Sequence, residues 1–258
     1  MQIKLWENEI PYYSSEFDTP NNMTAYLVDT YHKVPTIVVL PGGGYHGRAE
    51  HEGKVIAEFF NSQGFNAFVF DYRVLPNKFP CAIADAQRAV KIIKKNSEQY
   101  HVDTEKIFVI GFSAGGHLAS CIATMDDYAK IGDELDKISP SVSGAILSYP
   151  VISGYKKDGW IASCVEGIAE GTDITAESIS THKLVTKDTP PCFLWHTAED
   201  ATVPVQHSFL FATALRENNV PFEMHIYPFG PHGLGLAKST NDVSNWPYLA
   251  AQWIKNNF

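Results

Sequence analysis

Charged residues, cysteine pairs and long apolar runs are all scarce in this sequence, and each scarcity excludes a class of protein. Charged residues make up 19% of the 258 residues and hydrophobic ones 45%, which is typical of a globular chain and not of a disordered one. No apolar run approaches the roughly 18 residues that span a bilayer, so we expect no membrane segment. The four cysteines form no CxxC pair and no zinc-ligand spacing, which favours buried, reduced thiols.

Basic residues are also few, because 20 Lys and Arg stand against 29 Asp and Glu, a net charge of −9. An acidic surface repels phosphate backbones, so we expect no nucleic-acid partner. The stretch Met1–Glu7 has no apolar segment after its single lysine, so we expect no signal peptide and a cytoplasmic protein. No His, Cys and Asp cluster has metal-ligand spacing, and neither GxGxxG nor Gly-Lys-Ser/Thr occurs, so we expect no metal and no cofactor.

From Val34 onward, short apolar runs alternate with amphipathic stretches. This alternation predicts an α/β fold in which a mostly parallel sheet has helices on both faces. The expected strands are 34–40, 67–72, 107–110, 144–149, 192–196 and 223–227, and the expected helices are 51–60, 82–93, one from 114, 205–217 and one at the end of the chain. Residues 152–191 interrupt the rhythm and contain several glycines. We therefore expect a single domain over 1–258 with a small cap or lid inserted at about 152–191.

The strongest local signal is the stretch from Gly111 to Gly116, Gly-Phe-Ser-Ala-Gly-Gly, which fits G-x-S-x-G. It directly follows an expected strand and precedes an expected helix. A strand that turns sharply into a helix presents Ser113 at the carboxyl edge of the sheet, where a nucleophile is exposed. The sequence therefore predicts that Ser113 is a catalytic nucleophile.

A serine hydroxyl needs a histidine as base and a carboxylate to orient that histidine. On such a turn the acid and then the histidine follow the serine along the chain. Among the histidines far downstream, His232 lies in a glycine-rich loop after the last expected strand, whereas packing or surface roles are favoured for His182, His196, His207 and His225. Glu199 and Asp200 compete for the acid, and Asp200 is favoured because it precedes Val-Pro, a turn that returns the chain into the next helix.

The oxyanion that forms during acyl transfer needs hydrogen-bond donors. One expected donor is the backbone N–H of Ala114, the residue after the nucleophile. The other is expected from Gly43 or Gly44 in the loop Pro-Gly-Gly-Gly-Tyr, which follows the first expected strand of the alternation. Glycines allow that backbone to approach the reacting carbonyl closely.

With these residues in place, the chain resembles the α/β-hydrolase superfamily, and more closely the bacterial esterase and lipase group that includes acetylesterases, acetyl-xylan esterases and feruloyl esterases. The motifs are Pro-Gly-Gly-Gly-Tyr at 41–45, Asp-Tyr-Arg at 71–73, Gly-Phe-Ser-Ala-Gly-Gly-His at 111–117, Asp-x-x-Val-Pro at 200–204 and His-Gly-Leu-Gly-Leu at 232–236. Pro41 and Phe112 stand where hormone-sensitive-lipase-like enzymes carry His and Asp. This departure favours the acetylesterase branch.

The resemblance implies a serine carboxylesterase for short acyl esters, with acetylated sugars or xylo-oligosaccharides as the expected substrates. Tyr45, His46 and Trp160 are candidate substrate contacts, and ordinary loop or helix-start roles are favoured for His51 and Glu52. The alternatives are another serine hydrolase, such as a small peptidase or lipase, or a binding protein with this fold and no activity. The sequence makes no prediction about the oligomeric state.

Overall fold

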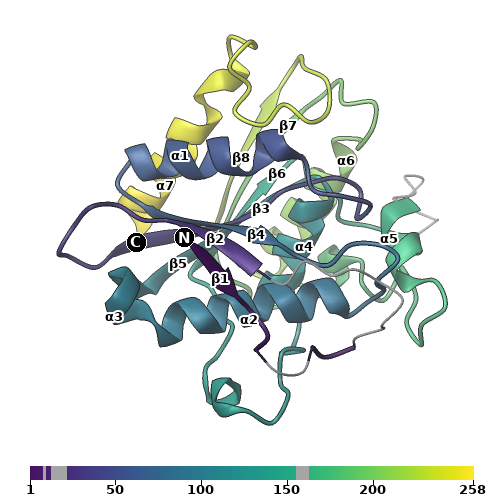
Figure 1. Ribbon diagram of the computed structural model, residues 1–258. Coiled ribbons are helices and arrows are strands. Elements are labelled where there is room, and N and C mark those ends of the chain that lie inside the picture. Colours follow the sequence, from purple (N-terminus) through teal and green to yellow (C-terminus); the bar gives the residue numbers. More distant parts are fainter. Residues whose placement is uncertain (8–9, 13–21, 155–162) are drawn as a thin grey trace.

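The structure describes residues 1–7, 10–12, 22–154 and 163–258 of the chain, in a computed structural model (Figure 1). The described residues form an eight-stranded sheet in the order β1-β2-β4-β3-β5-β6-β7-β8. The strands are β1 (Gln2–Lys4), β2 (Asn22–Tyr26), β3 (Val34–Leu40), β4 (Asn66–Asp71), β5 (Val102–Phe112), β6 (Gly144–Ser148), β7 (Cys192–Thr197) and β8 (Phe222–Tyr227).

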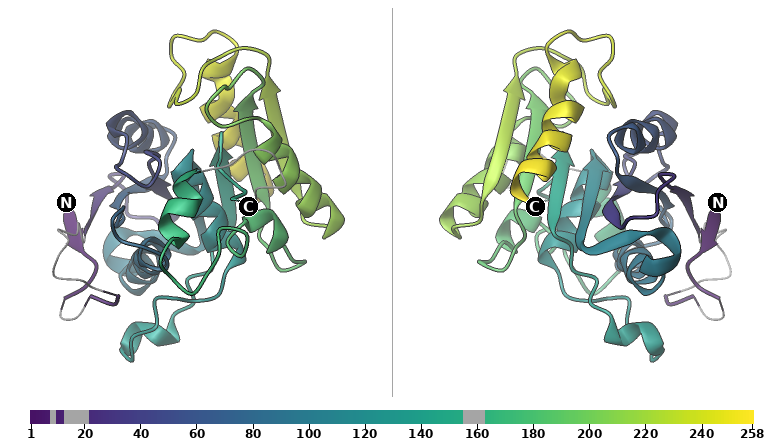
Figure 2. Two further views of the ribbon diagram at one scale, coloured as in Figure 1. Left: turned by 90° about the vertical axis from the view of Figure 1, so that its right-hand side faces the viewer. Right: turned by 90° about the vertical axis from the view of Figure 1, so that its left-hand side faces the viewer.

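Most of the sheet is parallel. From β4 to β8 in the sheet order every neighbouring pair runs parallel, while β1 and β2 are joined antiparallel at one side. Figure 2 shows β1 and β8 at opposite sides of the molecule. Parallel strands end at a common edge, so the loops that follow β3, β5, β6, β7 and β8 are brought together there.

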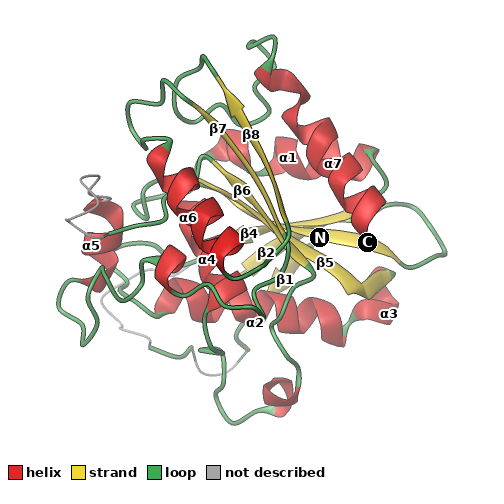
Figure 3. Ribbon diagram, turned by 180° about the vertical axis from the view of Figure 1, so that it is seen from behind, coloured by secondary structure: helices red, strands yellow, loops and turns green. Residues whose placement is uncertain are grey.

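Helices cover both faces of the sheet (Figure 3). One face carries α1 (Lys54–Ser62) and α7 (Trp246–Asn257), and the other carries α2 (Cys81–Lys95), α4 (Ala114–Thr124) and α6 (Gln206–Glu217). The shorter elements are α3 (Ser97–Tyr100), α5 (Ser163–Ala169) and the 3-10 turns η1 (Glu50–Glu52), η2 (Glu134–Lys137), η4 (Thr181–Lys183) and η5 (Val243–Asn245). No helix in the described ranges combines the length and the apolar character that crossing a membrane requires.

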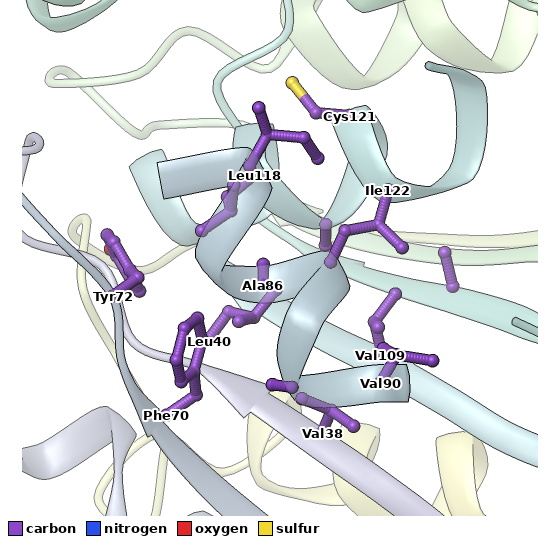
Figure 4. Packing of buried hydrophobic residues seen from close by; sticks show 14 of the residues in the cluster. Val38, Leu40, Phe70, Tyr72, Ala86, Val90, Val109, Leu118, Cys121 and Ile122 are labelled. Atoms are coloured by element: carbon purple, nitrogen blue, oxygen red, sulfur yellow. The ribbon is translucent and has the colours of Figure 1, made fainter. Parts of the chain in front are cut away.

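The central strands are apolar without interruption because both of their faces are buried. On β3, Val38 and Leu40 pack into the core beneath α2 and α4, while Ile37 and Val39 pack into the core beneath α1 and α7. Figure 4 shows the first of these cores, in which side chains of β3, β4 and β5 meet those of α2 and α4. Both cores are continuous, so the sheet is a rigid base for the loops at its edge.

The expected α/β fold with a mostly parallel sheet is confirmed, and the differences lie at element ends. Strand β5 begins at Val102 and not near 107, because Val34 pairs with Val102 before a register shift. The helix expected at 51–60 is a 3-10 turn, η1, followed at Gly53 by α1. The connection from β6 to β7 contains α5 and η4, and its residues 155–162, which include Trp160, lie outside the described residues.

Candidate active site

Ser113 lies between the end of β5 and the start of α4, with backbone angles φ 53° and ψ −118°. A left-handed φ is costly for a residue with a side chain and is typical of functional turns. The turn requires close packing: a Cβ on Gly115 would lie 2.1 Å from the carbonyl oxygen of Leu40 at the end of β3. Glycine at this position lets α4 begin directly against β3, with the Ser113 side chain at the sheet edge.

Ser113, His232 and Asp200 form a chain of hydrogen bonds, although they follow three different strands. His232 Nε2 is 2.8 Å from Ser113 Oγ, and His232 Nδ1 is 2.6 Å from Asp200 Oδ2. A carboxylate only accepts hydrogen bonds, so Nδ1 carries the proton and Nε2 accepts from the serine hydroxyl. An imidazole held in this way is able to take the hydroxyl proton when the oxygen attacks a carbonyl.

Asp200 accepts hydrogen bonds on both carboxylate oxygens. Oδ1 accepts from the backbone N–H groups of Thr202 and Val203, both at 2.9 Å, and Oδ2 faces His232. Burial alone would raise the pKa of the Asp200 carboxyl, but hydrogen bonds from His196 and His232 and from the Val203 N–H hold that pKa well below its usual value. Asp200 therefore stays ionised, and the competing residue Glu199 is exposed.

The contact between His196 and Asp200 was missed by the sequence reasoning, which favoured a packing or surface role. His196 is fully buried, and its Nε2 lies 2.9 Å from the Val203 carbonyl oxygen and 3.3 Å from Asp200 Oδ2. Its Nδ1 accepts from the Ser208 hydroxyl at 2.8 Å. The available signal was the spacing, because His196 stands four residues before Asp200 at the end of an apolar strand.

The expected oxyanion donors line the same edge of the sheet. In the described part of the chain, the backbone N–H groups of Gly43, Gly44 and Ala114 have no hydrogen-bond acceptor. For Ala114 this follows from its position, because the first N–H groups of a helix have no partner within the helix. Gly43 has φ 131°, a conformation open only to glycine. Free N–H groups in such a position would be able to bind the negative charge that develops if Ser113 Oγ attacked a carbonyl.

A cavity of about 580 Å³ opens over Ser113 and His232. Its volume lies within the range of small-molecule sites, roughly 300–1,000 Å³. The lining comes from the segment after β3, the turn after β5, the connection between β6 and β7, the loop after β7 with the start of α6, and the loop after β8. It comprises Gly43, Gly44, Ala49, His51, Glu52, Ser113, Val151, Ser163, Cys164, Ala201, Thr202, Val203, Pro204, His207, His232 and Gly233.

Of the three candidate substrate contacts, the two that the structure describes, Tyr45 and His46, do not line this cavity. Tyr45 is buried, and its hydroxyl donates to His117 Nδ1 at 2.9 Å, so its side chain faces the core. His46 is exposed and stands outside the described cavity lining. Trp160 lies outside the described residues. In contrast, His51 and Glu52, for which ordinary roles were favoured, do line the cavity.

Tyr149 is a further site residue that no sequence motif pointed to. It follows β6 directly, is buried, and its ring packs edge-on against the His232 imidazole with 5.0 Å between the ring centres. Its hydroxyl donates to Glu52 Oε1 at 2.6 Å. Both partners are far from Tyr149 in sequence, so only the fold reveals the contact. Among the described residues, no three His, Cys, Asp or Glu side chains gather as a metal site would require.

One family model and several known proteins are similar to this chain. A family model described as BD-FAE matches residues 25–215. The chain is 40% identical to endo-1,4-beta-xylanase B of Butyrivibrio fibrisolvens over 90% of this chain and 38% of that protein. It is 29% identical to an acetylxylan esterase of Xylanibacter ruminicola over 81% of this chain and 44% of that protein. The chain thus spans less than half the length of these two curated relatives.

Among solved structures, the acetyl ester-xyloside bifunctional hydrolase of Caldicellulosiruptor lactoaceticus superimposes with a TM-score of 0.90 at 39% identity. The match covers 99% of this chain and 96% of that one, so the two folds agree over nearly their whole length. The α/β-hydrolase architecture expected from the motifs is therefore confirmed, and so is the resemblance to the bacterial esterase group.

Proposed function

The chain belongs to the BD-FAE family of α/β hydrolases, and from this premise we propose that it is a serine esterase that removes acetyl and other short acyl groups from acylated sugars, xylo-oligosaccharides above all. The observation that carries the proposal is the hydrogen-bonded chain of Ser113, His232 and Asp200 at the floor of an open cavity. We assign the nucleophile to Ser113, the base to His232 and the orienting carboxylate to Asp200.

In the first half of the proposed reaction, Ser113 Oγ attacks the ester carbonyl carbon while His232 Nε2 takes the hydroxyl proton. The carbonyl oxygen becomes an oxyanion, which the N–H groups of Ala114 and of Gly43 or Gly44 bind. When this intermediate collapses, the bond to the sugar oxygen breaks and His232 returns the proton to the departing alcohol. The acyl group remains on Ser113 as an ester.

In the second half a water molecule takes the place of the alcohol. His232 removes a proton from the water, the hydroxide oxygen attacks the acyl carbon, and a second oxyanion forms in the same place. Its collapse releases the carboxylic acid and returns the proton from His232 to Ser113 Oγ. Asp200 stays ionised throughout and stabilises the imidazolium that forms in each half.

The acylated-sugar substrate is supported by the relatives. An acetylxylan esterase and an acetyl ester-xyloside hydrolase are both similar to this chain, and the second matches it over nearly the full length of both. The second carries more weight, because the chain covers 96% of it but only 44% of the acetylxylan esterase and 38% of the xylanase. We also propose that the β6–β7 connection is a small cap, since Val151, Ser163 and Cys164 from it wall the cavity.

The test is acetate release from acetylated xylo-oligosaccharides, compared with hydrolysis of p-nitrophenyl acetate. We expect both substrates to be cleaved, with the higher kcat/KM for the sugar ester. Because Ser113 is the nucleophile, Ser113→Ala should lower kcat by about 10⁵–10⁶ without changing the circular dichroism spectrum. A Ser113→Ala variant that keeps more than a few per cent of the activity would rule out this assignment.

Assays on p-nitrophenyl acetate, p-nitrophenyl palmitate and a peptide anilide separate an acetylesterase from a lipase, a peptidase and a binding protein. Preference for p-nitrophenyl palmitate would indicate a lipase, cleavage of a peptide anilide would indicate a peptidase, and inactivity on every ester would indicate a binding protein. The Caldicellulosiruptor neighbour is named for a second activity on xylosides. An aryl xyloside assayed beside the aryl acetate shows whether this chain shares that activity, and Ser113→Ala shows whether the same site performs it.

A further inference from the structure

Glu52 is a buried carboxylate at the edge of the cavity, where a charge is expensive to keep. Its side chain is only 3% exposed. Among the described residues no lysine or arginine nitrogen lies within 4 Å of its carboxylate, and the nearest basic group is His51, with Nε2 3.7 Å from Oε1. His51 Nε2 is committed elsewhere, because it donates to the Gly233 carbonyl oxygen at 2.8 Å. A buried carboxylate without a cation needs hydrogen-bond donors to offset its loss of water.

Among the described residues, the Glu52 carboxylate accepts two hydrogen bonds, one on each oxygen. Oε2 accepts from the backbone N–H of Gly42 at 2.7 Å, and Oε1 accepts from the Tyr149 hydroxyl at 2.6 Å. The Tyr149 oxygen also accepts from the backbone N–H of Gly235 at 2.9 Å. Because a carboxylate only accepts, the bond between Tyr149 and Glu52 uses the tyrosine's proton. An amide in place of the carboxylate would have one acceptor too few.

Tyr149 is held in an unusual conformation that aims it at this network. Its backbone has φ 36°, a left-handed conformation that is disfavoured for a bulky residue and occurs where the surroundings require it. The ring lies between the imidazole of His232 and the indole of Trp195, both in edge-on contact. Burial and then the charge of Glu52 raise the pKa of the Tyr149 hydroxyl well above its ordinary value, so it remains a donor.

The network joins the two halves of the site. Gly42 directly precedes Gly43 and Gly44, the proposed oxyanion donors, and Gly235 lies three residues after His232. We propose that Glu52 is a positioning residue. Through Gly42 and Tyr149, its carboxylate fixes the oxyanion loop, residues 41–45, relative to the loop that carries His232. This inference rests on the esterase function proposed above, and it adds two residues, Glu52 and Tyr149, to the groups on which the rate depends.

The expected consequence is on the chemical step and not on substrate binding. If the network is broken, the N–H groups of the oxyanion loop and the His232 imidazole are no longer held in fixed positions relative to each other. A misplacement of about 1 Å costs up to about 100-fold in rate. Tyr149 is not among the described residues that line the cavity, so the KM of Tyr149→Phe should stay within about threefold. Glu52 does line the cavity, so Tyr149→Phe is the clearer test of KM. The transition state loses stabilisation that the bound substrate does not have.

The experiment uses Glu52→Gln, Tyr149→Phe and the double variant in the full-length protein. Glu50→Gln and Tyr31→Phe are matched controls, because Glu50 is an exposed residue of the same 3-10 turn and Tyr31 is 95% exposed. For each variant, kcat and KM are measured on p-nitrophenyl acetate, with active sites titrated and the melting temperature recorded. The inhibition constant of an aryl trifluoromethyl ketone, to which Ser113 Oγ adds to give an oxyanion while His232 takes the proton, is measured in parallel.

We expect each single variant to lower kcat by about 10- to 100-fold and to raise the ketone's inhibition constant by a similar factor. The double variant should be no slower than the slower single variant within about twofold, because both substitutions break one network. The controls should match the wild type.

Values of kcat per titrated site within twofold of wild type, or single effects that multiply in the double variant, would overturn the inference. Should Glu52→Gln fail to fold, Tyr149→Phe decides the question alone, since it removes one oxygen and keeps the ring. An inactive wild type, or an active Ser113→Ala variant, would disprove the proposed function and with it the inference. The inference alone would be disproved if the wild type were active, Ser113→Ala were inactive, and the Glu52 and Tyr149 variants kept wild-type activity.

Discussion

At Asp200 two histidines face one carboxylate oxygen, and their geometries differ. His232 Nδ1 is 2.6 Å from Oδ2, whereas His196 Nε2 is 3.3 Å from it and closer, at 2.9 Å, to the Val203 carbonyl. His196 is wholly buried, while the side chain of His232 is 17% exposed towards the cavity. The shorter bond therefore belongs to the histidine that can reach a substrate, and the longer one helps to fix the loop that presents Asp200.

Replacing this carboxylate should separate orientation from nucleophilicity. Asp200→Asn keeps the size of the side chain but presents an amide to His232 Nδ1, which favours the wrong tautomer. By analogy with other serine hydrolases we expect kcat to fall by about 10⁴. The control is Glu199→Gln, an exposed neighbour, which should keep nearly full activity on p-nitrophenyl acetate. If Glu199→Gln did the greater damage, the acid would be Glu199.

His117 is a buried histidine that titrates outside the physiological range. Its Nε2–H donates to the Ile179 carbonyl at 2.8 Å, and its Nδ1 accepts from Tyr45. Burial lowers the pKa of His117 from 6.5 to about 4, despite the opposing hydrogen bond to Ile179. Below about pH 6.5, His117 is therefore protonated in the unfolded chain, whereas in the folded chain it stays neutral until about pH 4. Falling pH in that window stabilises the unfolded state.

We predict from this sign that the free energy of unfolding falls as the pH drops from about 6.5 to 4. A shift of this size corresponds to about 3 kcal/mol. Urea unfolding at pH 4.5 and pH 7 measures how the free energy of unfolding changes with pH. His117→Gln should lose the contribution of His117 to this change, whatever the absolute stability of the variant. His32→Gln, at an exposed histidine, should keep the wild-type slope. Equal slopes for His117→Gln and wild type would contradict the prediction.

Tyr149 and Glu52, whose contact the sequence could not predict, are far apart along the chain. Ser113, Asp200 and His232 were predicted because each directly follows a recognisable strand within a short motif. Tyr149 bonds to Glu52 across 97 residues and to Gly235 across 86. Neither contact follows from local pattern, because both depend on which strands are neighbours in the sheet. For His196 a packing or surface role was favoured; the residue is buried, but its contact with Asp200, only four residues later, was not foreseen.

At the scale of elements, the close contact between α4 and β3 shapes the turn that presents Ser113. A Cβ at Gly115 would meet the carbonyl oxygens of Leu40 at 2.1 Å and Pro41 at 2.6 Å, both of which are backbone atoms. Pro41 begins the loop that carries the proposed oxyanion donors, Gly43 and Gly44. Any separation of α4 from β3 therefore moves Ser113 away from these proposed donors.

Gly115→Ala should consequently damage both stability and activity. We expect a loss of about 1–3 kcal/mol in the free energy of unfolding, as for other overpacked sites, and a fall in kcat of at least about tenfold. Gly47→Ala is the control, because a Cβ at Gly47 meets nothing within 4 Å and the residue has no left-handed φ. It should stay within about 0.5 kcal/mol of wild type. A Gly115→Ala protein as active as Gly47→Ala would mean that the two elements need not touch.

Element prediction succeeded where the hydrophobic pattern was clear, as an apolar run in a strand or as a helical repeat in α6. The strands β3 and β7 and the helix α6 were predicted to within one residue of their observed ends. The start of β5 was missed because Val102–Lys106 is mostly polar and is held as strand only by pairing with Val34. Local pattern does not contain that pairing, which is set by tertiary structure.

For the whole molecule, the parallel sheet explains how residues 119 positions apart, Ser113 and His232, come within hydrogen-bond distance. Every loop of the site follows the carboxyl end of a strand, and the order of the strands places these loops side by side. The β6–β7 connection emerges at the same edge. Its residues Val151, Ser163 and Cys164 wall the cavity, which limits what can reach Ser113.

A walled cavity of about 580 Å³ must hold both the acyl group and the alcohol of the substrate, so we predict a limit on acyl length. Each methylene that fits contributes about 0.8 kcal/mol of binding, so activity would rise along the series if space were available. Methylenes that do not fit must displace packed side chains such as Val151 and Val203, which are both buried. We expect kcat/KM for p-nitrophenyl esters to be highest at acetyl or propionyl and to fall at least about tenfold by octanoyl. Ser113→Ala supplies the background rate for each ester. A maximum at octanoyl or longer would rule out both the short-acyl preference and the cap, while the serine-hydrolase mechanism would stand.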